Sequence, residues 1–231
     1  MTPSGDSNND GPAPRTIHEE RSLSPMRKTI ARRLHESYTS AVHVTVSRSV
    51  AVTQLVAVAA EAEDVSLTDY LICALSETLT RHPEFNATFE DDAHRLYEEH
   101  NVGVAVDIEA GLVTPVIPDV GRKTVEEVAT VRHQLTERMN AGEYTMDDFR
   151  GGTITISNLG VLGVDSFTPV INPPEVAIVG IGRITDRLRK EGSESVEQKA
   201  LTLDLSFDHR VVDGADAARF LETLSEEISS Y

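Results

Sequence analysis

The sequence predicts a mixed α/β (α+β) fold, a two-layer sandwich in which helices cover a mixed β-sheet. Segments with the 3.6-residue period of amphipathic helices and segments with the alternation of strands occur along the whole chain. Several of the strands follow one another through short turns, as in hairpins. A strictly alternating strand–helix fold with an all-parallel sheet is therefore not expected.

The N-terminal residues are expected to form an arm before the folded domain. Residues 1–21 are rich in Ser, Gly, Asn, Asp and Pro and have no apolar period, which is typical of a disordered arm or the stump of a linker. The domain then spans residues 22–231. With 39% hydrophobic residues, a chain of this length can bury a core.

The first helix is predicted to begin at Ser24, its N-cap, with Pro25 in the first turn. Its apolar stripe consists of Met26, Ile30, Leu34 and Tyr38. Its basic side consists of Arg27, Lys28, Arg32 and Arg33. This basic side is either a solvated face or a contact with a ligand or another subunit.

The remaining helices begin at capping residues and end near Gly or Pro. They are predicted at residues 53–62, 66–82 and 124–141, in a short turn at 145–149, and after Gly214. The predicted strands are residues 42–52, 86–89, 94–97, 102–108, 112–117, 153–157, 175–184 and 199–207. Residues 102–117 are expected to form a hairpin that turns at 109–111.

Composition excludes several classes of function. The net charge of −17 argues against nucleic acid as a partner, because its phosphates would be repelled. Only four lysines stand against 38 acidic residues, which is typical of proteins from salt-loving organisms, although an acidic mesophilic protein is the alternative. No apolar run reaches the roughly 20 residues of a membrane span and no signal peptide is recognised, so a cytoplasmic protein is expected. The lone Cys73 lies on an apolar helical face and is expected to be buried rather than nucleophilic.

The candidate active site is the stretch 206–215, where a strand pattern ends on a histidine and a helix begins. His209 is predicted to lie in a turn at the mouth of the strand, where an imidazole can act as a base on a ligand outside the sheet. Asp213, four residues later, can cap the helix. This motif alone favours a simpler interpretation, in which His209 only forms local hydrogen bonds and Asp213 only caps the helix, and the rest of the chain is needed to favour the catalytic one.

Other cofactor motifs are missing from the sequence. The glycines at 160, 163, 180 and 182 do not form a dinucleotide fingerprint, and there is no Walker lysine motif. The eight histidines show no metal-ligand spacing with cysteine or carboxylate, so no metal site is predicted.

Five stretches, in order along the chain, are similar to one known family. They read MRKTIARRL at residues 26–34, NVGVAVD at 101–107, GGTITISNLG at 151–160, NPPEVAI at 172–178 and DHRVVDG at 208–214. Together they resemble the catalytic domain of the dihydrolipoamide acyltransferase component of 2-oxo-acid dehydrogenase complexes. Each motif alone is weak, but the ordered set is specific.

The resemblance implies the fold of chloramphenicol acetyltransferase, a two-layer sandwich that assembles as a homotrimer and often further into a large hollow cage. It implies an active-site channel between neighbouring subunits, entered by CoA from one end and by dihydrolipoamide from the other. By resemblance, His209 is the general base and Ser157 the oxyanion stabiliser, and the two meet from adjacent subunits. Asp213 is expected to hold the turn by capping the helix or pairing with an arginine. Arg210 is a candidate neighbour of the CoA phosphates, and His43 is expected to be structural.

The sequence departs from the family in three places. The family's proline before the first-strand histidine is Val42 here, and carboxylates often found further along that strand are Ser49 and Ala51, so the shape of this strand is open. No stretch resembles a lipoyl domain or a peripheral-subunit-binding domain. The lipoyl group is therefore expected on another polypeptide, or the chain is a truncated form.

The expected partners are a lipoyl-bearing protein and the dehydrogenase components. Two alternatives stay open: a non-catalytic scaffold subunit that only forms the core, and a CoA-dependent acyltransferase with a different acceptor. The motifs do not specify whether the acyl group is acetyl, succinyl or branched-chain.

Overall fold

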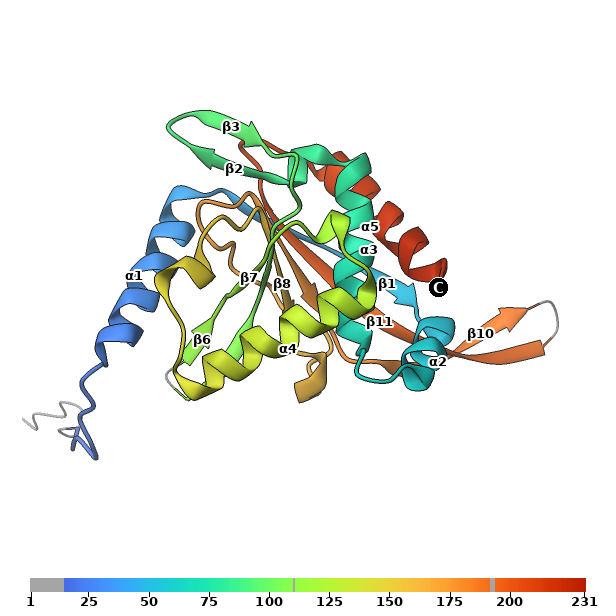
Figure 1. The fold of residues 1–231 in the computed structure, drawn as a ribbon, viewed down its shortest axis with the longest axis horizontal. Coiled ribbons are helices and arrows are strands. Elements are labelled where there is room, and N and C mark those ends of the chain that lie inside the picture. The colour runs from blue at the N-terminus through green and yellow to red at the C-terminus, as the bar shows by residue number, and fades with distance from the viewer. Residues whose placement is uncertain (1–14, 110, 192–193) are drawn as a thin grey trace, which may run out of the picture.

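The fold is built on one mixed β-sheet with helices against it, as predicted (Figure 1). The computed structural model describes residues 15–109, 111–191 and 194–231. The strands of the sheet are β1 (His43–Ala51), β4 (Val102–Val104), β7 (Val116–Ile117), β8 (Ile154–Asn158), β9 (Ala177–Ile181), β10 (Thr185–Glu191) and β11 (Glu194–Asp208). They are ordered β1-β11-β9-β8-β4-β7, and β10 pairs with β11. Strands β4, β8 and β9 run parallel, and the other pairs are antiparallel.

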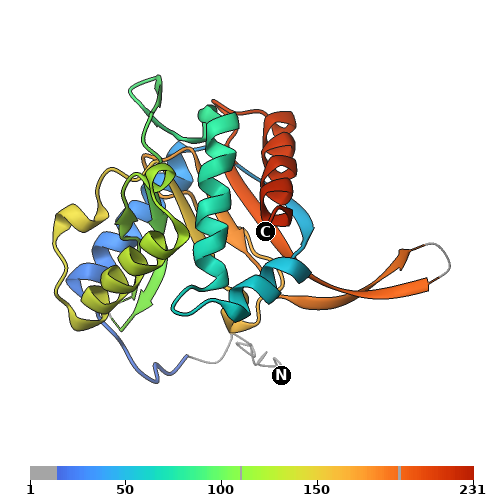
Figure 2. The same ribbon diagram turned by 45° about the vertical axis from the view of Figure 1, so that its right-hand side comes forward.

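Five α-helices and four 3₁₀ turns are found among the described residues. They are α1 (Pro25–Ser40), α2 (Thr53–Glu61), α3 (Leu67–Arg81), η1 (Pro83–Phe85), η2 (Val120–Arg122), α4 (Val125–Ala141), η3 (Met146–Phe149), η4 (Gly160–Leu162) and α5 (Gly214–Ser229). Helices α3 and α5 lie side by side on one face of the sheet (Figures 1 and 2). The rings of Phe85 and Phe220 pack 4.4 Å apart in the core beneath them, and both are fully buried.

Capping explains where the helices begin. The Ser24 hydroxyl accepts a hydrogen bond from the amide of Arg27 at the start of α1, as predicted. At α4, Thr124 and Glu127 form the predicted capping box. Gly142 ends α4 with a φ of +73°, a left-handed conformation that glycine adopts without steric cost.

The predicted apolar stripe of α1 is wrong in its second half. Leu34 and Tyr38 are exposed, at 44% and 71%. Ser37 faces inward instead and donates a hydrogen bond to the carbonyl of Ile171 at 2.5 Å, and Arg33 donates to the carbonyl of Pro173 at 3.0 Å. The inward face of this helix is therefore set by polar contacts with the backbone of residues 171–173.

The predicted hairpin at residues 102–117 is present but interrupted. Strand β4 pairs with β7, and β5 (Val106–Ile108) pairs with β6 (Gly111–Val113) in the same register. The break falls at Pro115, which has no N–H to complete the ladder. Residue 110 of the predicted turn lies outside the described residues. The predicted strands near residues 86–97 form a separate ribbon, β2 (Ala87–Glu90) and β3 (Ala93–Leu96).

The predicted strand at residues 175–184 is too long. Strand β9 ends at Ile181, and Gly182 after it is packed so closely against other backbone that a Cβ there would lie 2.1 Å from the carbonyl oxygen of Asp165. Strand β10 was not predicted, and β11 begins five residues before the predicted 199. The two form a hairpin arm that projects from the body of the molecule (Figures 1 and 2). Its sequence is charged and lacks the alternation that identifies half-buried strands.

The N-terminal arm can be compared only in part. Residues 1–14 lie outside the described residues, and residues 15–24 form neither helix nor strand. The division at residue 21 stays a prediction. Within the described part of the chain, no helix combines the length and apolar character needed to cross a membrane.

Candidate active site

Ser157 lies on β8, in the middle of the sheet, and it is 7% exposed. It pairs with Gly180 of β9, and Gly180 pairs with Asp204 of β11. Directly paired residues have their side chains on the same face of a sheet, so Ser157 and Asp204 share a face. Leu205 and Phe207, the alternate residues of β11, face the apolar core with α3 and α5.

The face that bears Ser157 is lined with buried polar side chains that have partners. Asp204 is fully buried and accepts hydrogen bonds from the hydroxyls of Ser47 and Ser166 and from the amide of Phe167. The hydroxyls of Thr45 and Ser206 lie 2.7 Å apart on the same face. Such partners are needed because an unpaired polar group buried in protein is costly.

His209 follows the last residue of β11 and lies in the turn before α5, as predicted. Its amide donates to the carbonyl of Val42, which fixes the turn to the start of β1. The side chain is 40% exposed, and its Nδ1 lies 3.7 Å from Oδ1 of Asp213. Asp213 occupies the N-cap position of α5, where its carbonyl, rather than its side chain, accepts from the amides of Asp216 and Ala217.

The residues on either side of His209 form a compact ion pair. Asp208 is 3% exposed, and its carboxylate accepts hydrogen bonds from the amides of Val42 and Arg210 and from the Arg210 guanidinium. Burial opposes ionisation of Asp208, but these hydrogen bonds outweigh it and hold the pKa of the carboxyl below its ordinary value. The guanidinium also stacks over the ring of Phe89, 4.7 Å from its centroid. Arg210 therefore fixes the turn, and its role toward CoA stays a prediction.

Within one chain, Ser157 and His209 lie far apart on the sheet. Asp204 is two strands from Ser157, and His209 lies five residues further along β11. With about 4.8 Å between strands and about 3.3 Å per residue, their Cα atoms lie roughly 19 Å apart. A single chain therefore does not bring them into contact.

Glu175 is a buried carboxyl group that the sequence analysis did not single out, although it belongs to the stretch NPPEVAI. It is 5% exposed, and its two carboxylate oxygens accept hydrogen bonds from Thr155 and Asn172. Burial raises the pKa of Glu175 to about 7, although these hydrogen bonds and the charge of Arg33 act in the opposite direction. The lone Cys73 is half-buried, and burial raises the pKa of its thiol to about 12, so it stays protonated.

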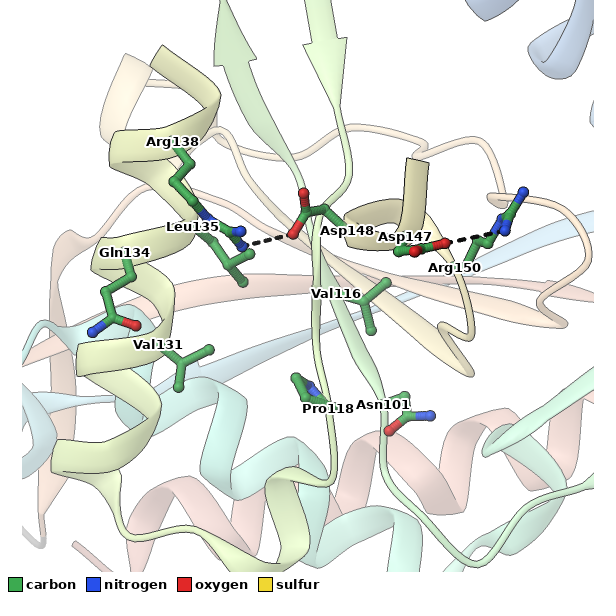
Figure 3. Close-up of a pocket in the computed structure, with 10 residues that line it drawn as sticks. All are labelled: Asn101, Val116, Pro118, Val131, Gln134, Leu135, Arg138, Asp147, Asp148 and Arg150. Carbon is green, nitrogen blue, oxygen red and sulfur yellow. Dashed lines mark hydrogen bonds and ion pairs between the residues drawn. The ribbon is translucent and has the colours of Figure 1, made fainter. Parts of the chain in front are cut away.

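A cavity of about 370 Å³ lies between α4, β7 and η3 (Figure 3). Its cationic groups are already paired: Arg138 lies 2.6 Å from Asp148, and Arg150 lies 3.1 Å from Asp147. The side chains of the predicted site do not line this cavity. Among the residues that the structure describes, no three His, Cys, Asp or Glu side chains lie close enough together to hold a metal ion.

The structure resembles solved structures of the family that the motifs suggest. One is the dihydrolipoamide acetyltransferase of Azotobacter vinelandii, with a TM-score of 0.89 and 30% identity over 95% of this chain and 97% of that one. Another is the cubic core of the pyruvate dehydrogenase multienzyme complex, with a TM-score of 0.87 and 30% identity over 94% and 96%. A chloramphenicol acetyltransferase, at 13% identity and a TM-score of 0.58 over 85% and 94%, shares the fold.

Sequence comparison gives the same family. The dihydrolipoyllysine-residue acetyltransferase component of the pyruvate dehydrogenase complex of Bacillus subtilis is 39% identical over 210 residues, 86% of this chain and 47% of that protein. The chain spans about half the length of the curated relatives it matches. Residues 16–231 match the family model of the 2-oxoacid dehydrogenases acyltransferase catalytic domain. The chain therefore belongs to the catalytic-domain family of the 2-oxoacid dehydrogenase acyltransferases.

Proposed function

We propose that this protein transfers an acyl group between CoA and dihydrolipoamide, with His209 as general base and Ser157 as oxyanion stabiliser. One observation carries the assignment. A crystallographic and enzymatic study of the Azotobacter vinelandii relative concerns the catalytic role of a serine, a histidine 52 residues after it, and an asparagine four residues further on. The same spacings separate Ser157, His209 and Asp213.

The proposed reaction needs a base and an oxyanion donor. A thiol with a pKa of about 8.5 is mostly protonated at neutral pH, and an imidazole with a pKa of about 6.5 can take its proton in the transition state. His209 removes the proton from the acceptor thiol as its sulfur attacks the thioester carbonyl. The carbonyl oxygen becomes an oxyanion, to which the Ser157 hydroxyl donates. Collapse of the intermediate expels the donor thiolate, which takes the proton back from the imidazolium.

The two residues are proposed to come from adjacent subunits. The separation of roughly 19 Å within one chain supports this arrangement, because a donor to the oxyanion must lie about 3 Å from it. The proposed assembly is a homotrimer with one site at each subunit boundary, extended further if the chain forms a cage like the cubic core to which it is similar. Nε and one terminal nitrogen of Arg210 bind Asp208. Arg210 is proposed to contact the CoA phosphates through its other terminal nitrogen.

The proposed partners follow from the substrates. The lipoyl group would be carried by another domain or chain, and the dehydrogenase component would load it with the acyl group. Acetyl is the first acyl group to test, because the Bacillus subtilis relative is named for it. The cytoplasm is the proposed compartment, and the acidic composition suits a salt-rich one.

The direct test is an assay with acetyl-CoA and free dihydrolipoamide that follows the release of CoA. The wild-type protein should turn over, and a non-catalytic scaffold predicts no turnover. His209→Ala should lower kcat by ~10²–10⁴-fold. His133→Ala, which changes an exposed histidine on α4, is the matched control and should leave kcat unchanged. Profiling succinyl and branched-chain donors then identifies the acyl group, and light scattering distinguishes a trimer from a larger core.

A further inference from the structure

Glu175 lies between the two elements that bear Ser157 and His209. Its Oε2 accepts a hydrogen bond from the Thr155 hydroxyl at 2.6 Å, and its Oε1 accepts one from the side-chain amide of Asn172 at 2.7 Å. The chain makes room for this carboxyl at Gly152, where a Cβ would lie 2.8 Å from Oε1. The buried carboxyl of Glu175 thus has specific neighbours at Thr155, Asn172 and Gly152.

The hydrogen bond between Glu175 and Thr155 connects Glu175 to the strand that bears Ser157. Thr155 and Ser157 are two residues apart on β8, so their side chains point to the same face, about 7 Å apart along the strand. Both are buried. The hydrogen bond from Thr155 to Glu175 therefore holds the part of β8 from which the Ser157 hydroxyl projects.

The backbone next to Glu175 connects it to the turn that bears His209. The carbonyl of Val176, the residue after Glu175, accepts a hydrogen bond from the amide of Asp208, the residue before His209, at 2.9 Å. The carbonyl of Pro174, the residue before Glu175, accepts one from the amide of Phe89, whose ring supports Arg210. The backbone on both sides of Glu175 thus supports the turn that bears the imidazole.

We propose that the ionised carboxylate of Glu175 is a positioning residue for this site, which fixes the Ser157 strand and the His209 turn relative to the rest of the subunit. The inference rests on the proposed function. Glu175 does not touch the reacting atoms, and it acts through Thr155 and through the backbone at residues 174–176.

The ionised form accepts from both donors at once: Oε2 accepts from the Thr155 hydroxyl and Oε1 accepts from the side-chain amide of Asn172. A protonated carboxyl would instead donate its own hydrogen to Oγ1 of Thr155, and the donor and acceptor of this hydrogen bond would be exchanged. Burial brings the pKa of Glu175 to about 7, so both forms are populated near neutral pH.

The charged and titratable groups around Glu175 are few. A cavity of about 340 Å³ opens beside Glu175, and the groups that line it are Arg33 from α1, Glu90 from β2, Tyr97 after β3 and Arg150 after η3. Of these, the charge of Arg33 favours the ionised carboxylate. Glu90 is the matched control carboxylate, because it lines the same cavity and its side chain is 57% exposed.

The test compares kcat and KM of the full chain across pH 6 to 8.5, with acetyl-CoA and dihydrolipoamide. Glu175→Gln removes the charge at constant size and resembles the protonated carboxyl. Its kcat should be about ten-fold below wild type at pH 8.5, with KM changed less than two-fold, because misplaced catalytic groups lose transition-state stabilisation. The ratio of the two kcat values should approach one at pH 6, where the wild-type carboxyl is itself protonated. Glu90→Gln should match the wild type throughout.

Thr155→Val provides a second variant. It should lower kcat about as much as Glu175→Gln, and the double variant should lose little more, because the two residues act through one hydrogen bond. If Glu175→Gln does not assemble, the kcat of Thr155→Val relative to wild type across the same pH range tests the proposal instead. A ratio that is independent of pH, or a kcat within two-fold of wild type, would overturn the proposal while wild-type turnover upholds the proposed function. Absence of wild-type turnover would overturn both.

Discussion

Mixing two inactive variants, Ser157→Ala and His209→Ala, should restore activity if each site is shared between two subunits. Each variant alone keeps one of the two groups in every site. Removal of the base should cost ~10²–10⁴-fold in rate, and removal of an oxyanion donor ~10²–10³-fold. A mixed oligomer, by contrast, contains some boundaries where an intact His209 faces an intact Ser157.

The size of the recovery follows from the geometry. Under the proposed function, each site takes its histidine from one subunit and its serine from the next, because the two residues lie roughly 19 Å apart in one chain. In a randomly assembled equimolar mixture, each residue is intact at a given boundary with a probability of one half. About a quarter of the sites should therefore be active, at least ~25-fold above either variant alone.

The assay is acetyl transfer by oligomers that form from the two variants expressed together with different affinity tags. A mixture of wild type with the double variant is the matched control. A site shared by two subunits predicts about a quarter of the wild-type activity for this control, whereas a site within one chain predicts about a half. Recovery no greater than the average of the two single variants, together with a half-active control, would refute the shared site.

Three further predictions concern stability and the site. Burial raises the pKa of Glu175 from its ordinary value of 4.5 to about 7, so its stabilising contribution is present below pH 4.5 and is lost as pH rises through 7. Relative to Glu175→Gln, the wild type should lose roughly 3 kcal/mol of unfolding free energy across that window, measured by urea titration, and parallel curves would contradict this. Phe220→Ala should cost about 3–5 kcal/mol, because it empties a fully buried site against Phe85; a loss below about 1 kcal/mol in the same titration would be inconsistent with the packing. Asp213→Asn should keep kcat within about three-fold of wild type, since the side chain is 79% exposed and 3.7 Å from His209. A hundred-fold fall would make Asp213 a catalytic partner instead.

Two buried carboxyl groups near the predicted site, Asp208 and Glu175, have opposite electrostatic situations. Asp208 is buried with Arg210 against it and ionises readily, so it supports the turn at any pH near neutrality. Glu175 is buried with only neutral donors in hydrogen-bonding contact, so its ionised form is costly and its protonated form favours stability. If the proposal for Glu175 holds, activity rises over the pH range in which stability falls.

Local chemistry determined much of the fold. The helix starts at Ser24 and Thr124 and the stop at Gly142 follow from hydrogen bonds between neighbouring residues, which sequence patterns report directly. The hairpin at residues 102–117 was likewise legible from its turn and flanking strands. The position of His209 at a strand end followed from the change of period between β11 and α5.

Long-range contacts decided the rest. The exposure of Leu34 and Tyr38, the close packing of Gly182 after β9 and the burial of Glu175 each depend on segments more than ten residues away, which no local period reports. The sequence by itself determined which residues form the family's motifs and in what order they occur along the chain. Only the tertiary structure decided that Ser157 and His209 lie two strands and about five residues apart on one sheet, because strand order and register are set by packing across the whole domain.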